Sequence, residues 1–311
     1  MTVPILHHYP VSPFAEKVRL ILGYKQLAWK SVIIPMIMPK PDLTALTGGY
    51  RRTPVLQIGA DVYCDTALIC DVLEQLAPSP TLYPSATEGA ARILAQWADS
   101  ALFTTAMAWN FQPAGVADVF AGASQETIQA FVADRAAMRG GAPRMPVGDA
   151  AGSYRLYLQR LAGLLQTHDF LLGAQPCVAD FAAYHPLWFT LERTPSVAGI
   201  LQDTPAVLAW MARMKSLGHG SPQRCDAQAA LQIAREASPA PWDAPNTQDH
   251  HGIALGSTVV VAADHFGQEP SQGELVAATP RHYTLRRTDP RAGTVHVHFP
   301  RLGFTLKKAS P

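Results

Sequence analysis

What this sequence most clearly lacks is an excess of charge of either sign. Its 25 Lys and Arg residues nearly balance its 24 Asp and Glu residues, which gives a formal net charge of +1. Such a chain creates no global field that would recruit nucleic acid or an acidic membrane, so no nucleic-acid partner is expected. Apolar runs of the roughly 18 to 20 residues needed to span a bilayer are missing, as is a secretion-signal pattern. We therefore expect a cytoplasmic protein without a membrane partner.

Cysteine is also scarce. The four cysteines form no Cys-x-x-Cys pair and have no metal-type spacing with nearby histidines. This excludes a disulfide framework and predicts no metal site, and Cys70 is interpreted as a small buried hydrophobic residue. Proline, by contrast, is abundant, with 26 residues in the chain. A dense proline patch at 238–245 shows no helical or strand periodicity, which predicts a linker over 238–251.

Residues 1–83 alternate strand-like and helix-like patterns in the order βαβαββα. Strands and helices are expected at 3–6, 12–22, 29–34, 42–46, 54–58, 62–64 and 66–76. The short turn at 59–61 marks a hairpin, so the last two strands should be antiparallel, whereas the first βαβ unit should be parallel. The pattern predicts a small mixed sheet with helices on its faces.

Two further regions follow, each with its own pattern. Residues 84–237 predict an all-helical domain, with helices near 87–110, 125–138, 152–166, 178–191, 204–217 and 226–236. Residues 252–311 hold short β-type runs at 257–262, 273–277, 283–286, 294–299 and 303–306. Strands at such close spacing predict a small all-β domain, either a barrel or a twisted sheet that closes its own edges.

Ser12 and Pro13 open the first amphipathic helix. Ser12 falls at the N-cap and Pro13 at the first helical position, where the missing N–H costs nothing. One interpretation is that Ser12 is only a cap. The other is that its hydroxyl and the free N–H groups of the helix start face a bound anion. From these residues alone the cap is favoured.

Three other positions carry polar groups at the ends of predicted elements. Pro54 enters a strand where it gives no ladder N–H, so the Thr53–Pro54 bond is either cis, turning the Thr53 main chain toward an extended peptide, or an ordinary trans edge position. Asp65 and Thr66 form a helix cap or, as a site, hold the ammonium and carboxylate of an α-amino acid. Lys40 is either solvated in its loop or pairs with a second carboxylate.

Taken together, these residues resemble the glutathione S-transferase family. The resemblance rests on Ser-Pro-Phe-x-x-Lys-Val-Arg at 12–19, Lys-Pro-Asp-Leu-x-Ala-Leu at 40–46, Thr-Pro-Val-Leu at 53–56 and the acid–hydroxyl pair at 65–66. It extends over about residues 3–235 and implies a thioredoxin-like first domain and a helical second domain. Asp180, in a stretch similar to the family's helix-start motif, is then structural, and the last stretch lies outside the family pattern.

The resemblance also implies a ligand and a role for each site residue. Ser12 would stabilise the thiolate of glutathione, the co-substrate, with Tyr9 as a weaker candidate for the same role. The other implied glutathione-binding residues are Lys40, Arg52, Thr53, Pro54, Asp65 and Thr66. Ser12 replaces the Cys that members with thiol–disulfide chemistry carry, which argues against that activity. Asp65 replaces the more usual Glu, and the loop 47–51 departs from the family pattern.

A small electrophile is the implied second substrate, held between the domains. Its pocket is expected to include Val11, Phe14, Phe103, Met107, Trp109 and Tyr184. A homodimer is expected because members of the family are usually homodimers. Conjugation or peroxidase activity leads the functional hypotheses. The alternatives are a glutathione-dependent isomerase or ether-cleaving enzyme, and a non-catalytic binding or regulatory protein acting through its C-terminal β domain.

The C-terminal region carries histidines and basic residues. His296 and His298 share one face of a predicted strand, and His250 and His251 lie beside the linker; we interpret them as solvated. The basic residues are Arg281, Arg286, Arg287, Arg291, Arg301, Lys307 and Lys308. A solvated basic face is the favoured interpretation, and binding of an acidic partner is the alternative.

Overall fold

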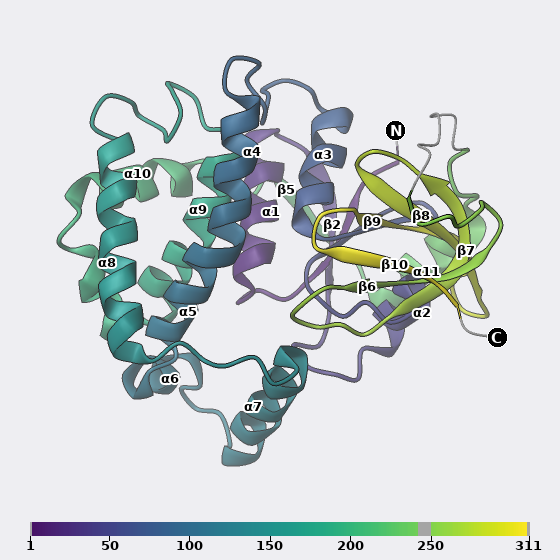
Figure 1. The fold of residues 1–311 in the computed structure, drawn as a ribbon, viewed down its shortest axis with the longest axis horizontal. Helices are drawn as coiled ribbons and strands as arrows, with labels where there is room; N and C mark the ends of the chain where they lie inside the picture. Colours follow the sequence, from purple (N-terminus) through teal and green to yellow (C-terminus); the bar gives the residue numbers. More distant parts are fainter. Residues whose placement is uncertain (1, 242–249, 310–311) are drawn as a thin grey trace.

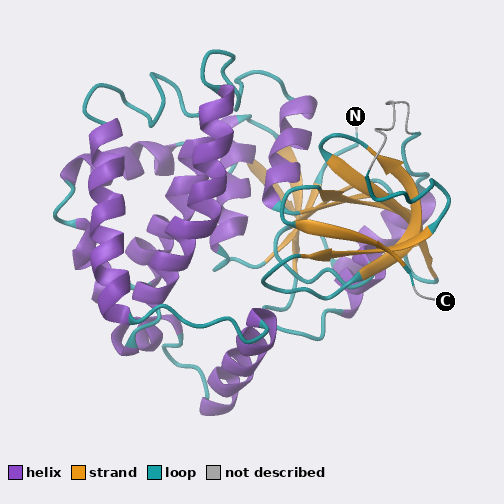
Figure 2. Cartoon of the chain, viewed as in Figure 1, coloured by secondary structure: helices purple, strands orange, loops and turns teal. Residues whose placement is uncertain are grey.

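The computed structural model describes residues 2–241 and 250–309. In space, a sheet of ten strands lies on one side of the described structure, and most of the helices lie on the other side (Figures 1 and 2). No helix within these ranges is both long enough and apolar enough to cross a membrane. Most of the expected linker, residues 242–249, lies outside the described residues.

The first part of the chain has the expected βαβαββα order. Its strands are β1 (Ile5–His8), β2 (Ala28–Ile33), β3 (Val55–Ile58) and β4 (Asp61–Cys64), and its helices are α1 (Pro13–Tyr24), α2 (Pro41–Thr47) and α3 (Thr66–Leu76). β1 pairs in parallel with β2 and antiparallel with β3, and the β3–β4 hairpin is antiparallel. This arrangement confirms the mixed sheet and places the carboxyl end of β1 at the start of α1.

The helical region follows the predicted segments closely. Its α-helices are α4 (Glu88–Trp97), α5 (Phe103–Asn110), α6 (Pro113–Val119), α7 (Gln125–Arg139), α8 (Val147–Leu164), α9 (Val178–Trp188), α10 (Pro205–Ser216) and α11 (Ala227–Glu236). The expected long helix over 87–110 is a continuous run in which the π-helical segment η1 (Ala98–Leu102) joins α4 to α5. A second π-helical segment, η2 (Phe189–Arg193), follows Pro186 at the end of α9, and the 3-10 segment η3 (Pro195–Leu201) precedes α10. The short α6, η3 and β5 (Ser221–Arg224) were not anticipated.

The C-terminal region is β-rich, as predicted. Its strands are β6 (Thr258–Ala263), β7 (Ser271–Ala278), β8 (His282–Asp289), β9 (Gly293–Pro300) and β10 (Phe304–Lys308). The parallel pairing of β9 with β4, with Val62 opposite Val297 and Tyr63 opposite His298, was not predicted from the sequence. The C-terminal strands therefore extend the first sheet, whose full order is β10-β6-β7-β8-β9-β4-β3-β1-β2-β5.

Two hydrophobic cores divide the molecule. One packs α1, α3, α4, α5, α8, α9 and α10 together, with Trp29, Tyr154 and Trp210 among its largest buried side chains. The other contains residues of α2, α11 and the C-terminal strands, including Leu231 and Phe299. α11, which the sequence placed with the helical region, thus packs on the sheet side, because its apolar face meets β9 and α2.

The C-terminal histidines are less solvated than expected. His298 is buried, stacks on Tyr63 at 4.5 Å between ring centroids and lies 3.0 Å from Asp61 Oδ1. The β9–β4 pairing covers it, which corrects the solvated interpretation. His296 also lies near Asp61, at 3.8 Å, whereas His250 and His251 are exposed. Within the described ranges, no group of three or more His, Cys, Asp or Glu residues could hold a metal ion.

The C-terminal basic residues do not form a free basic face. Arg287 donates to the carbonyls of Ala45 and Leu46 at the end of α2, where the helix dipole favours a cation. Arg286 pairs with Glu274, and Arg291 pairs with Asp42. Several of these cations therefore fasten the C-terminal strands to one another and to the first part of the chain.

Candidate functional site

Ser12 is the N-cap of α1, as the sequence predicts. Its side chain is buried, with 2% of its surface exposed, and its Oγ accepts a hydrogen bond of 3.2 Å from the Ala15 N–H. Pro13 occupies the first turn, so the helix begins without an unsatisfied donor there. The hydroxyl thus lies among the free N–H groups of a helix start, where the dipole favours an anion.

Tyr9 lies on the loop just before Ser12 and is half-buried. Its hydroxyl accepts a hydrogen bond of 3.3 Å from Arg135 Nη2. The Lys40 ammonium lies 5.7 Å from the centre of its ring. Burial raises the pKa of Tyr9, against the opposing effect of Arg135, so the phenol stays protonated near neutral pH.

Lys40 is buried beside Thr53, which overturns the interpretation of a solvated loop lysine. Its Nζ donates to the Arg51 carbonyl and to Thr53 Oγ1, both at 3.2 Å. Burial, followed by the charges of Arg135 and Arg51, lowers the pKa of Lys40 to about 8. The Thr53–Pro54 bond is cis, which is one of the two alternatives that the sequence left open.

Asp65 and Thr66 begin α3. Asp65 caps the helix by accepting from the Ala67 N–H at 2.9 Å, and its backbone has a φ of 76°, uncommon for a residue other than glycine. Burial raises the pKa of its carboxyl, and Arg52 Nη1 lies 3.9 Å from Oδ2. Thr66 is buried, with its Oγ1 accepting from Lys17 Nζ at 3.2 Å. Both residues therefore have defined orientations at a helix start.

A buried group of ionisable residues supports Thr66 from the helical core. We call Lys17, Thr66, Asp99 and His185 the interior ion group. Lys17 Nζ lies 2.5 Å from Asp99 Oδ2, and His185 Nε2 lies 2.9 Å from Asp99 Oδ1. Burial would raise the pKa of Asp99, but Lys17 and His185 outweigh it and the pKa is lowered. Burial lowers the pKa of His185 despite Asp99, so its imidazole is neutral at neutral pH.

A second ion group lies at the outer edge of the site. We call Arg51, Asp134, Arg135 and Glu269 the rim ion group. Arg51 pairs with Asp134 of α7 and, at 2.7 Å, with Glu269 of the β6–β7 loop, while Arg135 Nη1 lies 2.5 Å from Asp134 Oδ2. Figure 1 shows α7 standing apart from the other helices, at the bottom of the view. The group joins this helix and the C-terminal strands to the segment that contains Thr53.

Two hydrogen bonds to backbone carbonyls strengthen the same junction. The Gly267 N–H donates to the Met138 carbonyl at 2.7 Å, and Arg52 Nε donates to the Phe266 carbonyl at 2.6 Å. Glutathione-site residues expected from local motifs are thus held by residues far away in the chain. The sequence carried no signal for Asp134, Arg135 or Glu269. The sequence carried only a weak signal for Lys17, Asp99 and His185, because each is a charged or polar residue within an otherwise apolar helical stretch.

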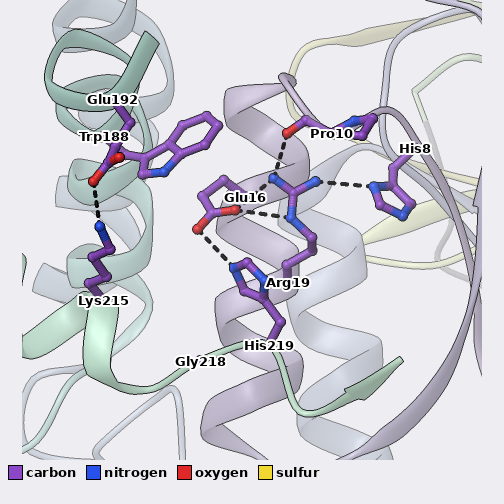
Figure 3. Close-up of a pocket in the computed structure, with 9 residues that line it drawn as sticks. All are labelled: His8, Pro10, Glu16, Arg19, Trp188, Glu192, Lys215, Gly218 and His219. Carbon is purple, nitrogen blue, oxygen red and sulfur yellow. Dashed lines mark hydrogen bonds and ion pairs between the residues drawn. The ribbon is translucent and has the colours of Figure 1, made fainter. Parts of the chain in front are cut away.

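A cavity of about 480 Å³ opens on one side of α1, between the sheet and the helical region (Figure 3). Its lining residues are His8, Pro10, Glu16, Arg19, Trp188, Glu192, Lys215, Gly218 and His219. On one wall Glu16 pairs with Arg19 at 2.6 Å and with His219 at 2.9 Å. On the other wall Lys215 pairs with Glu192 at 2.6 Å, beside the indole of Trp188. The cavity is therefore lined by charge pairs of both signs and one aromatic face.

None of the residues expected to hold an electrophile is among those lining this cavity. Phe14 and Phe103 do come together, with their ring centroids 4.6 Å apart, and both contact the ring of His185. Val11, Met107 and Trp109 are half-buried, and the Trp109 indole donates to the Val197 carbonyl. Tyr184 is buried in the helical core against Trp210, because its apolar helix is enclosed on all sides.

Comparisons with known proteins agree with this geometry. Models of the glutathione S-transferase N-terminal and C-terminal domains match residues 6–81 and 149–217. A GST-like protein from Pseudomonas syringae is 45% identical, and the match covers 99% of this chain and 100% of that one with a TM-score of 0.84. FtsZ-localized protein A from Caulobacter vibrioides is 26% identical over 221 residues, or 68% of this chain and 86% of the relative.

The beta-etherase LigF from Sphingobium sp. strain SYK-6 shares the fold at 19% identity, with a TM-score of 0.52 over 70% of this chain and 98% of its own. The similarity to the Pseudomonas protein, in contrast, runs through the C-terminal strands, which neither domain model covers. The chain therefore belongs to the glutathione S-transferase family.

Proposed function

We propose that this protein binds glutathione at the start of α1 and activates its thiol for attack on a small electrophile. The observation that carries this proposal is the buried hydroxyl of Ser12 at the N-cap of α1. A helix N-terminus with a hydroxyl donor stabilises a thiolate relative to the thiol and so increases the fraction of nucleophile near neutral pH. Ser12 donates a hydrogen bond to sulfur and forms no covalent bond.

The remaining polar residues fit the two ends of glutathione. The Lys40 ammonium has three hydrogens, of which the Arg51 carbonyl and Thr53 Oγ1 accept two. The third is left for a carboxylate of the ligand. Asp65 offers a carboxylate to the γ-glutamyl ammonium, and Thr66 offers a helix-start N–H to the γ-glutamyl carboxylate.

In the proposed reaction the thiol proton leaves to solvent, and the sulfur lone pair forms a bond to the electrophilic carbon. A leaving group departs with its electron pair, or the product takes up a proton where none is displaced. The electrophile would enter from the cavity bordered by Pro10, two residues before Ser12. Its charged walls favour a polar aromatic substrate over a purely apolar one.

The test is a calorimetric titration with glutathione, together with turnover assays on an aryl halide and an organic peroxide. Ser12→Ala should lower kcat/KM by about tenfold or more, because a hydrogen bond to a charged group is worth about 1.5 to 3 kcal/mol. Ser100→Ala, at an exposed serine of η1, is the matched control and should change little. If Ser12→Ala matches the control in every assay, Ser12 is not the thiolate stabiliser.

A second candidate function is a non-catalytic role in which the glutathione site serves structure or regulation. It is supported by the similarity to FtsZ-localized protein A, whose name describes a location and not a reaction. Tight glutathione binding without turnover of either substrate class, together with co-sedimentation with FtsZ polymers, would favour this role. The expected homodimer is tested in the same preparations by light scattering after size-exclusion chromatography.

A further inference from the structure

The segment between α2 and the cis Thr53–Pro54 bond lies against the C-terminal strands along its whole length. We call residues 48–52 the connecting segment. Its last two residues bond to the β6–β7 loop, as described above. In its middle, the Tyr50 N–H donates to Ser271 Oγ at 3.2 Å. Ser271 is the first residue of β7 and is fully buried, so this hydrogen bond is closed to water.

Two glycines allow the C-terminal region to approach the connecting segment closely. A Cβ at Gly49 would clash with the Pro270 carbonyl oxygen, and a Cβ at Gly48 would clash with the Arg287 guanidinium. Gly48 also has a φ of 82°, which favours glycine over other residues. The glycine pair in a loop that departs from the family pattern therefore has a structural reason, because it makes room for the C-terminal strands.

The side chain of Tyr50 fixes the same segment from within the core that contains the C-terminal strands. It is 3% exposed, and its ring centroid lies 5.9 Å from that of Phe299 and 6.1 Å from that of Phe304. The main chain and the side chain of Tyr50 are thus both held by C-terminal residues. The connecting segment cannot shift without disturbing that packing.

The connecting segment also leads directly into the residues proposed to bind glutathione. Lys40 Nζ donates to the Arg51 carbonyl, which belongs to the segment, and to Oγ1 of Thr53, which follows it. A shift of the segment would therefore move Thr53 and both acceptors of Lys40. We propose that Ser271 and Arg287 are positioning residues through which the C-terminal strands hold Thr53 and Lys40 in the arrangement that binds glutathione. This inference rests on the function proposed above and adds the C-terminal strands to its site.

The sulfur end of the site is held in a different way. Ser12 Oγ accepts from the Ala15 N–H within its own helix, so α1 sets its position. Disturbing the C-terminal contact should consequently weaken glutathione binding without slowing the step at sulfur, which raises KM and leaves kcat unchanged. A contact that served folding alone would change neither parameter of the folded protein.

The experiment compares Ser271→Ala with Thr279→Ala in the full chain, by calorimetric titration with glutathione and by steady-state kinetics. Ser271→Ala should raise the Kd and the KM for glutathione about threefold to fivefold at unchanged kcat, because the buried Tyr50 N–H loses its acceptor. Thr279 is the matched control, since it is also buried and follows the last residue of β7, where its hydroxyl donates to the His282 carbonyl. Thr279→Ala should leave all three values unchanged.

Gly49→Ala tests the same contact from the other side. The added Cβ forces the connecting segment away from Pro270, so the Kd for glutathione should rise about tenfold or more. Gly303→Ala is its control, because Gly303 has a φ of 82° in the C-terminal region but an added Cβ there meets no atom within 4 Å. Chemical denaturation identifies the variants that are folded, and Ser271→Ala decides the test if Gly49→Ala does not fold.

The outcomes separate this inference from the function on which it rests. If Ser271→Ala and Gly49→Ala bind glutathione as tightly as their controls, the C-terminal strands are attached to the site without positioning it. The inference is then overturned, and the proposed function stands. A fall in kcat at unchanged Kd overturns it as well, because the strands would then act on the step at sulfur. If the unaltered protein binds no glutathione, the proposed function is overturned together with the inference. If it binds glutathione but turns over neither substrate, the calorimetric Kd values decide the test.

Discussion

The interior and rim ion groups both support the candidate site. They share one arrangement of charges but differ in how much of it is exposed to solvent. In each, a carboxylate lies between two donors: Asp99 between Lys17 and His185, and Asp134 between Arg51 and Arg135. The interior group joins four helical elements, α1, α3, η1 and α9, and its Lys17 side chain is 1% exposed. The rim group depends on α7 and the β6–β7 loop, and its Glu269 side chain is 38% exposed.

This difference in burial predicts that one group mainly affects stability and the other mainly affects ligand affinity. Removing one partner from a buried pair leaves an uncompensated charge in a medium that solvates it poorly, so the interior group should decide stability. In the rim group the Arg51–Asp134 pair is also buried, with side chains 6% and 8% exposed, and only the Arg51–Glu269 pair is partly exposed, so that water screens it and it contributes little to stability. The Arg51–Glu269 pair should instead set the position of Arg51 and the neighbouring Thr53, and so affect ligand affinity more than folding.

The largest expected effect comes from breaking the interior group at Lys17. Lys17→Met should lower the free energy of unfolding by about 3 kcal/mol, because Asp99 loses its cation while still largely buried. Chemical denaturation measures this difference. Lys215→Met is the matched control, since its pair with Glu192 has nearly the same length, 2.6 Å against 2.5 Å, but its side chain is 65% exposed. The control should cost less than about 1 kcal/mol.

Equal losses of unfolding free energy in the two lysine variants would contradict the comparison, because burial would then not determine the size of the loss. The comparison would be supported if the loss of unfolding free energy in Lys17→Met disappears in an Asp99→Asn background. That result would show that the cost comes from the stranded carboxylate and not from lost packing of the lysine chain.

The second effect is a pH dependence that the interior group contributes and the rim group does not. Because burial lowers the pKa of His185 in the folded protein, the unfolded chain takes up a proton below its ordinary value of 6.5 while the folded protein does not. The unfolded state then binds more protons, so stability falls as pH decreases through this range. His185→Gln removes this contribution, and the slope of unfolding free energy against pH should decrease by up to about 1.4 kcal/mol per pH unit.

Denaturation curves between about pH 5 and pH 7 measure that slope, above the range in which the carboxylates titrate. His168→Gln, at an exposed histidine, is the control and should leave the slope unchanged. The rim group contains no histidine, so its variants should not alter the slope either. An unchanged slope in His185→Gln would mean that this imidazole titrates alike in the folded and unfolded states.

The sequence predicted those candidate-site residues whose structural role is local. Ser12 and Asp65 were identifiable because a helix cap is decided by a few neighbouring residues, and both are caps in the structure. Lys17 belongs to the same helix motif, yet its partner Asp99 lies 82 residues away. Periodicity shows that a charge falls on an apolar face, but it does not show which distant residue will neutralise it.

The C-terminal strands illustrate the same limit at the level of the fold. Their alternating apolar residues predicted five strands, because that pattern is a property of each strand alone. Their attachment to β4 was not predictable, since the outer edge of β4 bonds through backbone groups that every sequence possesses. For the same reason the pairing of Glu269 with Arg51 could not be predicted before β7 was placed.

The smallest expected effect comes from the rim group at Glu269. Glu269→Gln weakens its 2.7 Å pair with Arg51, whose carbonyl holds Lys40, and should raise the KM for glutathione about twofold to threefold with kcat unchanged. Steady-state kinetics at varied glutathione measures this split. Glu274→Gln is the matched control, because Glu274 is 37% exposed and pairs with Arg286 in the same sheet, away from the site. Equal kinetics in both variants would show that the rim group fastens the C-terminal strands without acting on glutathione. A fall in kcat for Glu269→Gln alone would mean that the rim ion group also affects the chemical step, and would extend the comparison from affinity to chemistry.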